Sequence, residues 1–302
     1  MGSRYPFRIL RQAFRNLYFL MFLNGFLVAS LFYFKMESYY EDGLFASIKS
    51  TIDAHLDPDD NADSLAVKAM NTCYHLMSNK GSTFSSGNLG PEADVIHSTA
   101  FDLMTTRGAC GSYSQVLARI LKTYHIPVRI AQMKAGGYFG AHNIVEAEIG
   151  SNWIVLDPTF NLCFHRPDSK LASFNDVHEN WSYYSRQVPS DYNPIYRYED
   201  VRYTNWTKIP IISPAARSLL SLIIGRERVN TFSMRTWFMN TYQVYVYFLV
   251  ALYIPLLLIT IRGLLKTKVF PSPEIPVTIR NVVKYIKPRL QGTHGTTSSY
   301  TH

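Results

Sequence analysis

The sequence predicts an α+β fold in which one helix packs against an antiparallel sheet, with a membrane-spanning helix on each side of this domain. Two uncharged apolar blocks, at residues 17–34 and 242–261, are long enough to cross a bilayer as helices. Between them, residues 112–124 have the apolar spacing of an amphipathic helix. Residues 128–133, 143–149 and 153–156 then read as strands, and residues 150–152 read as the turn of a hairpin.

The first apolar block is preceded by basic residues and followed by acidic ones. Four arginines lie within residues 1–16, and two glutamates and an aspartate follow the block, at residues 37–42. Because basic residues stay on the cytoplasmic side, residues 1–16 are expected in the cytoplasm, with the helix at 17–34 running outwards. A cleavable signal peptide is the alternative. Its apolar region would be shorter and would end in small residues, whereas residues 31–34 are bulky.

The second apolar block, residues 242–261, is followed at once by basic residues, Arg262, Lys266 and Lys268. Two spans of alternating direction place both termini in the cytoplasm, including the tail at 262–302. Residues 35–241 then form an extracytoplasmic domain, with its core at 57–212, which would be periplasmic in a Gram-negative cell. The lipid bilayer is therefore an expected partner of this two-pass chain.

The excess of basic residues does not indicate nucleic acid as a partner. The formal net charge is +8 and the isoelectric point is about 9.3. The arginines and lysines are concentrated beside the two apolar blocks, and membrane topology explains this placement better than a phosphate-binding face does. We expect no nucleic-acid binding.

The segments around the predicted helix and strands give weaker signals. Residues 43–55 and 93–104 are expected to form short helices, and residues 63–79 an amphipathic helix capped by Asp63. The acidic turn at 57–63 invites a calcium hypothesis, but Ala62 and Lys68 stand where a calcium loop needs Gly and Glu, so a solvated turn is favoured. Residues 162–212 are expected to be irregular with a strand or two, and residues 214–224 to form a helix too short to span.

Three residues between the blocks have the chemistry of a thiol enzyme. Cys110 lies in a glycine-rich turn at the start of the predicted helix, where backbone N–H groups and the helix dipole lower a thiol pKa. His142 opens one predicted strand and Asp157 closes its hairpin partner, so strand pairing brings the two side by side. A thiol nucleophile needs a base, and the base needs a partner that fixes its tautomer. We therefore predict Cys110, His142 and Asp157 as a catalytic triad.

The order of these motifs resembles the transglutaminase-like superfamily, whose members have a papain-like thiol-enzyme core. The resembling pattern is G-x-C, a helix, I-P-x-R, H-x-x-x-E and W-x-x-x-D-x-T, over residues 108–159. The resemblance implies Cys110 as nucleophile, His142 as base, Asp157 as the orienting acid and Arg129 as a structural residue.

Two departures from the family pattern affect the expected site. Asn143 follows the histidine, where members often have an aromatic residue. The upstream oxyanion donor, often Gln or Trp in such enzymes, has no clear counterpart; Ser85, Asn88 and Ser98 are candidates only.

The remaining cysteines and histidines leave two alternatives open. Cys73 and Cys163 could form a disulfide that spares Cys110, or could be two ordinary buried thiols. Cys110, His142, Cys163 and His165 are residue types that bind zinc, but they lack the paired short spacings of a zinc site. We expect no metal and no cofactor.

These features together predict a membrane-tethered, extracytoplasmic, cysteine-dependent acyl-transfer enzyme that acts on amide bonds at the cell envelope. Resolution of its thioester by water would make it a protease or amidase, and resolution by an amine would make it a cross-linking transglutaminase. The expected substrate is a protein, peptide or glycan at the cell surface. The alternative is an inert module of the same fold that holds a partner protein or surface glycan, for which the aromatic residues at 174–206 could serve. A channel accessory is disfavoured because the apolar blocks offer few polar groups.

Overall fold

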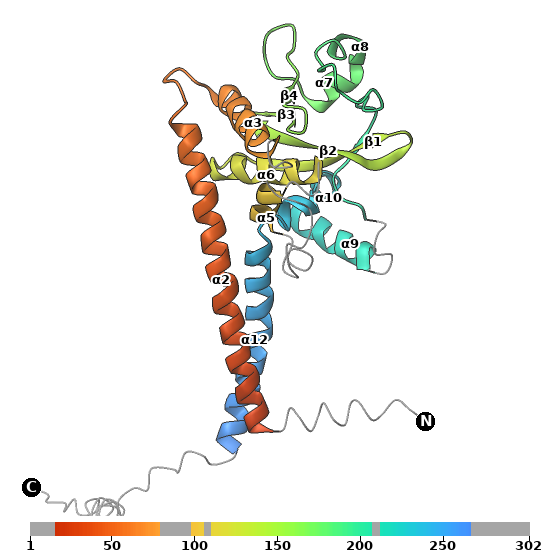
Figure 1. Cartoon of the computed structure of the whole chain (residues 1–302). Helices are drawn as coiled ribbons and strands as arrows, with labels where there is room; N and C mark the ends of the chain where they lie inside the picture. Colours follow the sequence, from red (N-terminus) through yellow and green to blue (C-terminus); the bar gives the residue numbers. More distant parts are fainter. Residues whose placement is uncertain (1–15, 79–97, 106–109, 207–211, 267–302) are drawn as a thin grey trace, which may run out of the picture. The chain divides into compact units, whose positions relative to one another are not determined.

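The computed structural model describes residues 16–78, 98–105, 110–206 and 212–266 (Figure 1). Its contacts divide the chain into two compact units. The larger unit, Leu31–Phe248, contains the sheet and the helices around it. The smaller unit contains the described parts of residues 1–30 and 249–302. The fold class is α+β with an antiparallel five-stranded sheet, as the sequence predicts.

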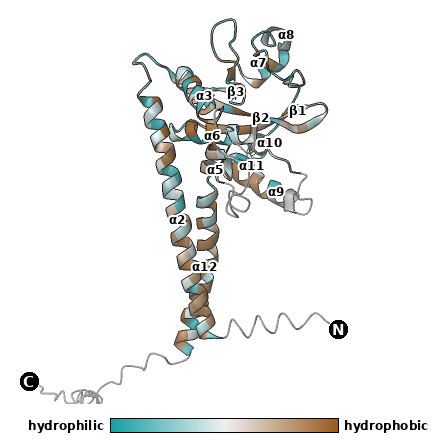
Figure 2. Ribbon diagram, viewed as in Figure 1, coloured by the Kyte–Doolittle hydropathy of each residue, from teal (hydrophilic) through white to brown (hydrophobic). Residues whose placement is uncertain are grey.

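Two helices are long and apolar enough to cross a membrane, α2 (Leu17–Asp53) and α12 (Thr241–Lys266). Figure 2 shows the hydrophobic colouring that runs along α12 and along much of α2. Within the smaller unit, Leu20, Leu27 and Leu256 are buried against one another. Asn24 Nδ2 donates to Thr260 Oγ1 at 2.8 Å, and a hydrogen bond of this kind between side chains of two helices stabilises helix pairing in an apolar environment.

The prediction of a separate short helix at residues 43–55 is wrong, because α2 continues without a break through 37 residues. No proline interrupts the segment that follows the first apolar block. The second half of α2 instead belongs to the larger unit, where Phe45, Ile48 and Ile52 are buried in its core. Arg119 also pairs with Asp42 of α2, and the Arg119 guanidinium lies over the Phe45 ring.

Helix α3 (Ala62–Ser78) follows the acidic turn, and its buried face contains Ala69 and Cys73. Its cap differs from the prediction: Asn61 Oδ1, rather than the Asp63 side chain, accepts from the Ser64 N–H at 2.9 Å. Capping by Asn and Asp is energetically similar, so local sequence does not discriminate between two neighbouring candidates.

The acidic turn before α3 holds an ammonium group of the chain itself. Lys68 Nζ lies 3.0 Å from Asp57 Oδ2 and 2.5 Å from Asp60 Oδ2, and it also donates to the His55 carbonyl. The calcium hypothesis loses its basis, because the lysine side chain contacts the carboxylates that would have to bind the ion.

The sheet consists of β1 (Val128–Ala135), β2 (Tyr138–Ile149), β3 (Asn152–Asp157), β4 (Leu162–Cys163) and β5 (Val201–Arg202). Their order is β4-β3-β2-β1-β5, and each pair is antiparallel. The predicted hairpin of β2 and β3 is present, with Glu148 paired to Trp153. A tight turn at Gly136 and Gly137, both at positive φ, joins β1 to β2, which begins at Tyr138.

Side chains alternate between two buried cores, one on each face of the sheet. Ile130, Val145 and Leu156 face the first core, together with α3, the second half of α2 and helix α6 (Cys110–Thr123). Met133, Ile144 and Val155 face the second core. Its other side is formed by aromatic residues of the segment after β4, namely Phe164, Phe174, Tyr184, Tyr192 and Tyr198. The aromatic residues at 174–206 therefore contribute largely to packing.

The other helices are short. Helix α5 (Thr99–Thr105) precedes α6, and α7 (Phe174–Glu179) and α8 (Trp181–Tyr184) lie in the segment between β4 and β5. That segment is otherwise irregular, as predicted. Helices α9 (Ile212–Ile224), α10 (Arg226–Asn230) and α11 (Met234–Trp237) follow before α12. Helix α11 is joined to the sheet, because Ser233 and Thr236 hydroxyl oxygens accept from the Ile130 N–H at 3.2 and 3.1 Å.

Candidate active site

Cys110 is the first residue of α6, where a helix leaves backbone N–H groups without intrahelical partners. The helix is fixed by its apolar face, since Val116, Leu117, Ile120 and Leu121 are fully buried. Its first turn is also tied to α5 by a hydrogen bond of 2.6 Å from Ser112 Oγ to Asp102 Oδ1. The Cys110 thiol is thus presented, half-buried, at the positive end of a rigid helix.

His142 and Asp157 lie side by side on the hairpin, as its pairing predicts. His142 Nε2 lies 2.6 Å from Asp157 Oδ2, and both side chains are buried. Asp157 Oδ1 accepts from the Thr159 N–H at 3.1 Å, which holds the carboxylate in place. Since β2 begins at Tyr138, His142 lies within its strand and does not open it. The bond at Nε2 leaves Nδ1 of the ring for the thiol.

The ionisation of Cys110 and His142 is coupled. Burial alone raises the pKa of Cys110, but the hydrogen bond and charge of His142, with hydrogen bonds from Asn143, outweigh it and hold that pKa below its usual value. Burial lowers the pKa of His142, but the charge and hydrogen bond of Asp157, with Cys110, raise it to about 9. These shifts favour a thiolate–imidazolium pair near neutral pH.

The other two cysteines behave differently from Cys110. All three cysteines are free thiols, so the structure has no Cys73–Cys163 disulfide. Burial raises the pKa of Cys73 and also that of Cys163. Cys163 Sγ and His165 Nε2 lie 3.7 Å apart, but no group of three or more His, Cys, Asp or Glu in the described part of the chain could hold a metal ion. The four-residue zinc arrangement is therefore not formed.

Asn143 contacts Cys110 directly, which sequence reasoning did not foresee. Its side-chain Nδ2 donates to Cys110 Sγ at 3.4 Å, and Arg235 Nη1 donates to its Oδ1 at 3.2 Å. Ser114 Oγ also donates to the Asn143 carbonyl at 3.1 Å. The signal in the sequence was the amide at the position where family members often have an aromatic residue. Arg235 lies 92 residues further along the chain and left no local signal.

In the described part of the site, the Asn143 amide is the side-chain donor that could serve as an oxyanion-hole group, because it points at the Cys110 sulfur. Among the predicted candidates, Ser85 and Asn88 lie outside the described residues. Ser98 Oγ accepts from the Phe101 N–H at 3.2 Å, so this hydroxyl caps α5. The Asn143 amide points at the sulfur and lies beside the first N–H groups of α6. When a thiolate attacks a carbonyl, the negative charge moves to the carbonyl oxygen, and this amide can then donate to that oxygen.

Replacing Asn143 by alanine is expected to move the pH midpoint of Cys110 alkylation upwards and to slow the reaction at pH 6 by about tenfold. A hydrogen bond to a charged group contributes about 1.5 kcal/mol or more, and the thiolate loses that donor. Rates of iodoacetamide labelling, read by mass spectrometry on the Cys110 peptide, measure the change. Asn71→Ala, at an exposed amide on α3, is the matched control. An unchanged midpoint would show that the contact does not stabilise the thiolate.

Aromatic rings cover the imidazole. The Tyr196 ring stacks on His142 with centroids 4.4 Å apart and planes 12° apart. Phe160 lies 5.7 Å from the imidazole and 4.7 Å from the Tyr192 ring. This apolar cover limits water around the His142–Asp157 pair, which strengthens their interaction and fixes the orientation of the ring.

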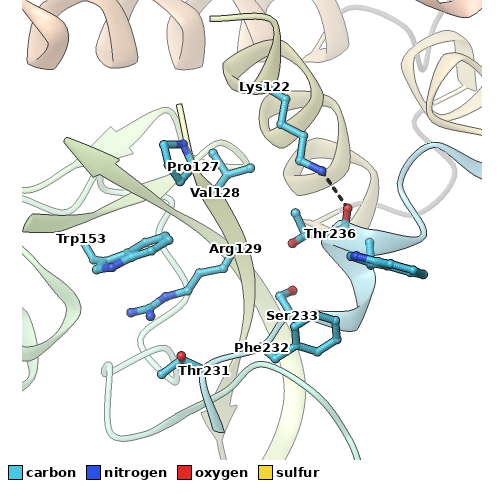
Figure 3. Close-up of a pocket in the computed structure, with 10 residues that line it drawn as sticks. Lys122, Pro127, Val128, Arg129, Trp153, Thr231, Phe232, Ser233 and Thr236 are labelled. Carbon is cyan, nitrogen blue, oxygen red and sulfur yellow. Dashed lines mark hydrogen bonds between the residues drawn. The ribbon is translucent and has the colours of Figure 1, made fainter. Parts of the chain in front are cut away.

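A cavity of about 300 Å³ lies next to the sheet, apart from the triad residues, none of which lines it. Figure 3 shows its lining, with Arg129 and Trp153 on one side and Thr236 on the other. Lys122 Nζ donates to the Thr236 carbonyl at 3.1 Å. The Arg129 guanidinium is already used: Nε lies 2.7 Å from Glu146 Oε2, and the Trp153 and Tyr203 rings lie 4.1 and 4.4 Å from it. The Arg129 guanidinium therefore stabilises the fold through these contacts.

The chain was compared with protein-family models, with curated proteins and with solved structures. No match was found in any of the three comparisons.

Proposed function

We propose that this chain is a membrane-tethered thiol acyl-transfer enzyme whose extracytoplasmic domain has a papain-like, transglutaminase-like core. Cys110 is the nucleophile, His142 the base and Asp157 the residue that orients the base. The observation that carries this proposal is the buried 2.6 Å contact between His142 and Asp157, next to a thiol whose pKa is lowered despite burial. Strongly shifted ionisable groups in such an arrangement are typical of catalytic sites.

The proposed reaction begins when the Cys110 thiolate attacks the carbonyl carbon of an amide. A C–S bond forms, and the negative charge moves to the carbonyl oxygen, where the N–H groups at the start of α6 and the Asn143 amide can hold it. The C–N bond then breaks as the His142 imidazolium gives its proton to the leaving amine. The product of this half-reaction is a thioester on Cys110.

The second half-reaction releases the acyl group. Neutral His142 takes a proton from a water or an amine as that nucleophile attacks the thioester carbonyl, and the C–S bond breaks to return the Cys110 thiolate. Water gives hydrolysis by a protease or amidase, whereas an amine gives transamidation. The triad geometry supports both outcomes, and the entering nucleophile decides between them.

The proposed location follows from the two apolar helices and the charges beside them. Basic residues before α2 and after residue 261 favour two spans with both termini in the cytoplasm. The domain between them then faces the outer side, where a protein, peptide or glycan of the cell surface is the expected substrate. Because Phe174, Tyr184 and Tyr198 are buried in the second core, they are not free to bind a surface glycan in an inert module.

The pH dependence of Cys110 alkylation tests the proposed site. In the full-length chain in detergent, Cys110 should react with iodoacetamide at pH 6, well below the ordinary thiol pKa of about 8.5. Cys73 and Cys163 in the same chain serve as internal controls, because burial raises both of their pKa values. His142→Ala should remove the reaction of Cys110 at pH 6. If Cys110 titrates as an ordinary thiol in both proteins, the proposal of a thiol enzyme is wrong.

A further inference from the structure

A polar row crosses the sheet and ends at the nucleophile. Arg202 of β5 is the register partner of Gln132 of β1, which is in turn the partner of Asn143 of β2. Paired residues on antiparallel strands project from the same face, so these three side chains lie on one face. Arg202 Nε donates to Gln132 Oε1 at 3.0 Å, and Asn143 Nδ2 donates to Cys110 Sγ at 3.4 Å.

A second arginine joins this row from outside the sheet. Arg235 of α11 donates to Asn143 Oδ1 at 3.2 Å. Its helix is anchored on both sides of the residue, because the Ser233 and Thr236 hydroxyls accept from the Ile130 N–H, and Ser233 also donates to the Ile130 carbonyl at 2.8 Å. The guanidinium is therefore held in a fixed position next to the site.

Among the described residues, these two half-buried arginines differ from Arg119 and Arg129 in having no carboxylate partner. Arg119 pairs with Asp42 and Arg129 pairs with Glu146. Within the described ranges, neither Arg202 nor Arg235 forms an ion pair with a carboxylate. Burial lowers the pKa of Arg235, the Cys110 thiolate opposes this effect, and the charge of Arg202 adds to it. Arg202 and Arg235 thus each donate to one member of the paired residues Gln132 and Asn143, so both positive charges lie along the same polar row.

Partly buried cations without counter-charge are costly unless a ligand supplies the anion. A carboxylate is the anion that a guanidinium binds best in a substrate of peptide character, through paired N–H donors. Each arginine uses one donor on this row, Arg202 to Gln132 Oε1 and Arg235 to Asn143 Oδ1, so the immediate neighbours of both guanidiniums on the sheet are polar.

We propose that Arg235 and Arg202 form an anion subsite that recognises a carboxylate on the acyl part of the substrate, close to the carbonyl that Cys110 attacks. This inference rests on the proposed function and narrows its substrate class to acidic peptides. A cationic group on the acyl side would be repelled by the same two charges. The attacking water or amine must then reach the thioester from the side away from this row.

The test compares two alkylating probes, iodoacetate and iodoacetamide, which share the reacting carbon and the leaving iodide and differ in charge. Both react with the thiolate, so the ratio of their rates cancels the fraction of thiolate and isolates the effect of local charge. The reaction is read by mass spectrometry on the Cys110 peptide of the full-length chain in a neutral detergent. The iodoacetate-to-iodoacetamide ratio should be about tenfold higher in the folded chain than in the urea-unfolded chain.

Variants locate the source of this preference. Arg235→Gln and Arg202→Gln should each bring the ratio towards its unfolded value, and Arg235→Lys should restore part of it. Arg186→Gln makes the same change of charge at an exposed position and should leave the ratio unchanged. Continued protection of the buried Cys73 thiol verifies that each variant is folded.

Three outcomes would overturn the subsite. The first is a folded ratio equal to the unfolded one, and the second is a ratio that neither arginine variant changes. The third is a ratio that Arg186→Gln lowers as much, because the net positive charge of the chain would then explain it. If iodoacetamide still labels Cys110 rapidly at pH 6 in these cases, the activated thiol stands and the subsite alone fails. If that labelling is slow, the proposed function fails first.

Discussion

Asp157→Asn is expected to slow iodoacetamide labelling of Cys110 at pH 6 on the order of 100-fold. The substitution keeps the shape of the side chain, but it removes the negative charge that faces the imidazole at 2.6 Å. Hydrogen bonds to charged groups contribute about 1.5–3 kcal/mol, and the upper part of this range corresponds to such a loss. An asparagine can also hold the ring in the wrong tautomer, which places no acceptor or charge towards the thiol.

The size of this effect follows from the balance of forces on His142. Burial lowers the pKa of His142, and the charge and hydrogen bond of Asp157 overcome it and raise the pKa to about 9. The thiolate–imidazolium pair exists between the lowered pKa of Cys110 and the raised pKa of His142. Without the carboxylate, burial dominates at His142 and its pKa falls. The thiolate then loses its counter-charge, its pKa rises, and the pH window for the pair closes from both sides.

A pH series from about 5 to 10, which brackets the ordinary pKa values of histidine and cysteine, measures both limits of this window. Asp168→Asn, at an exposed carboxylate between β4 and β5, is the matched control and should reproduce the wild-type profile. Labelling of Asp157→Asn that stays within about threefold of the wild type would contradict the role of Asp157 and leave His142 oriented by its aromatic neighbours alone.

Local sequence patterns were sufficient to predict the helix and the hairpin that carry the candidate site. The helix that begins at Cys110 and the hairpin that follows both depend on short-range patterns, namely helical spacing, strand alternation and a three-residue turn. Once the hairpin is accepted, its register places His142 near Asp157 without further knowledge. The proximity of His142 and Asp157 was therefore predictable from the sequence, and the structure adds the distance of 2.6 Å between His142 Nε2 and Asp157 Oδ2.

Other features depend on contacts between distant segments, for which the sequence has no local signal. The continuation of α2 beyond the apolar block is stabilised by the burial of Phe45 and Ile52 in the core of the larger unit. The contact of Arg235 with Asn143 joins residues 92 positions apart. In both cases the local sequence permits the structure, but only tertiary packing selects it.

Arg129→Met is expected to destabilise the larger unit by about 3–5 kcal/mol, because it leaves a buried carboxylate without its cation. Arg129 Nε lies 2.7 Å from Glu146 Oε2, and the Glu146 side chain is only 2% exposed. The guanidinium is also enclosed between the Trp153 and Tyr203 rings. Methionine fills a similar volume, so the loss reports the unpaired charge more than an empty cavity. Urea unfolding in detergent, followed by tryptophan fluorescence, measures the change in the free energy of unfolding.

Two further variants separate the charge from the packing. Arg166→Met breaks an exposed ion pair at 3.5 Å and should cost less than about 1 kcal/mol. Adding Glu146→Leu to Arg129→Met removes both buried charges and should recover most of the lost stability.

The same unfolding measurement decides whether Arg129, which lines the cavity of Figure 3, stabilises the fold or binds an anionic ligand. If Arg129 were held there to bind an anionic ligand, its loss would relieve an unfavourable buried charge and leave stability unchanged or raised. A large loss that Glu146→Leu repairs instead assigns Arg129 to the fold. Arg202 and Arg235 lack a carboxylate partner of this kind among the described residues, and this difference is why we propose them, and not Arg129, as the cations that bind a substrate.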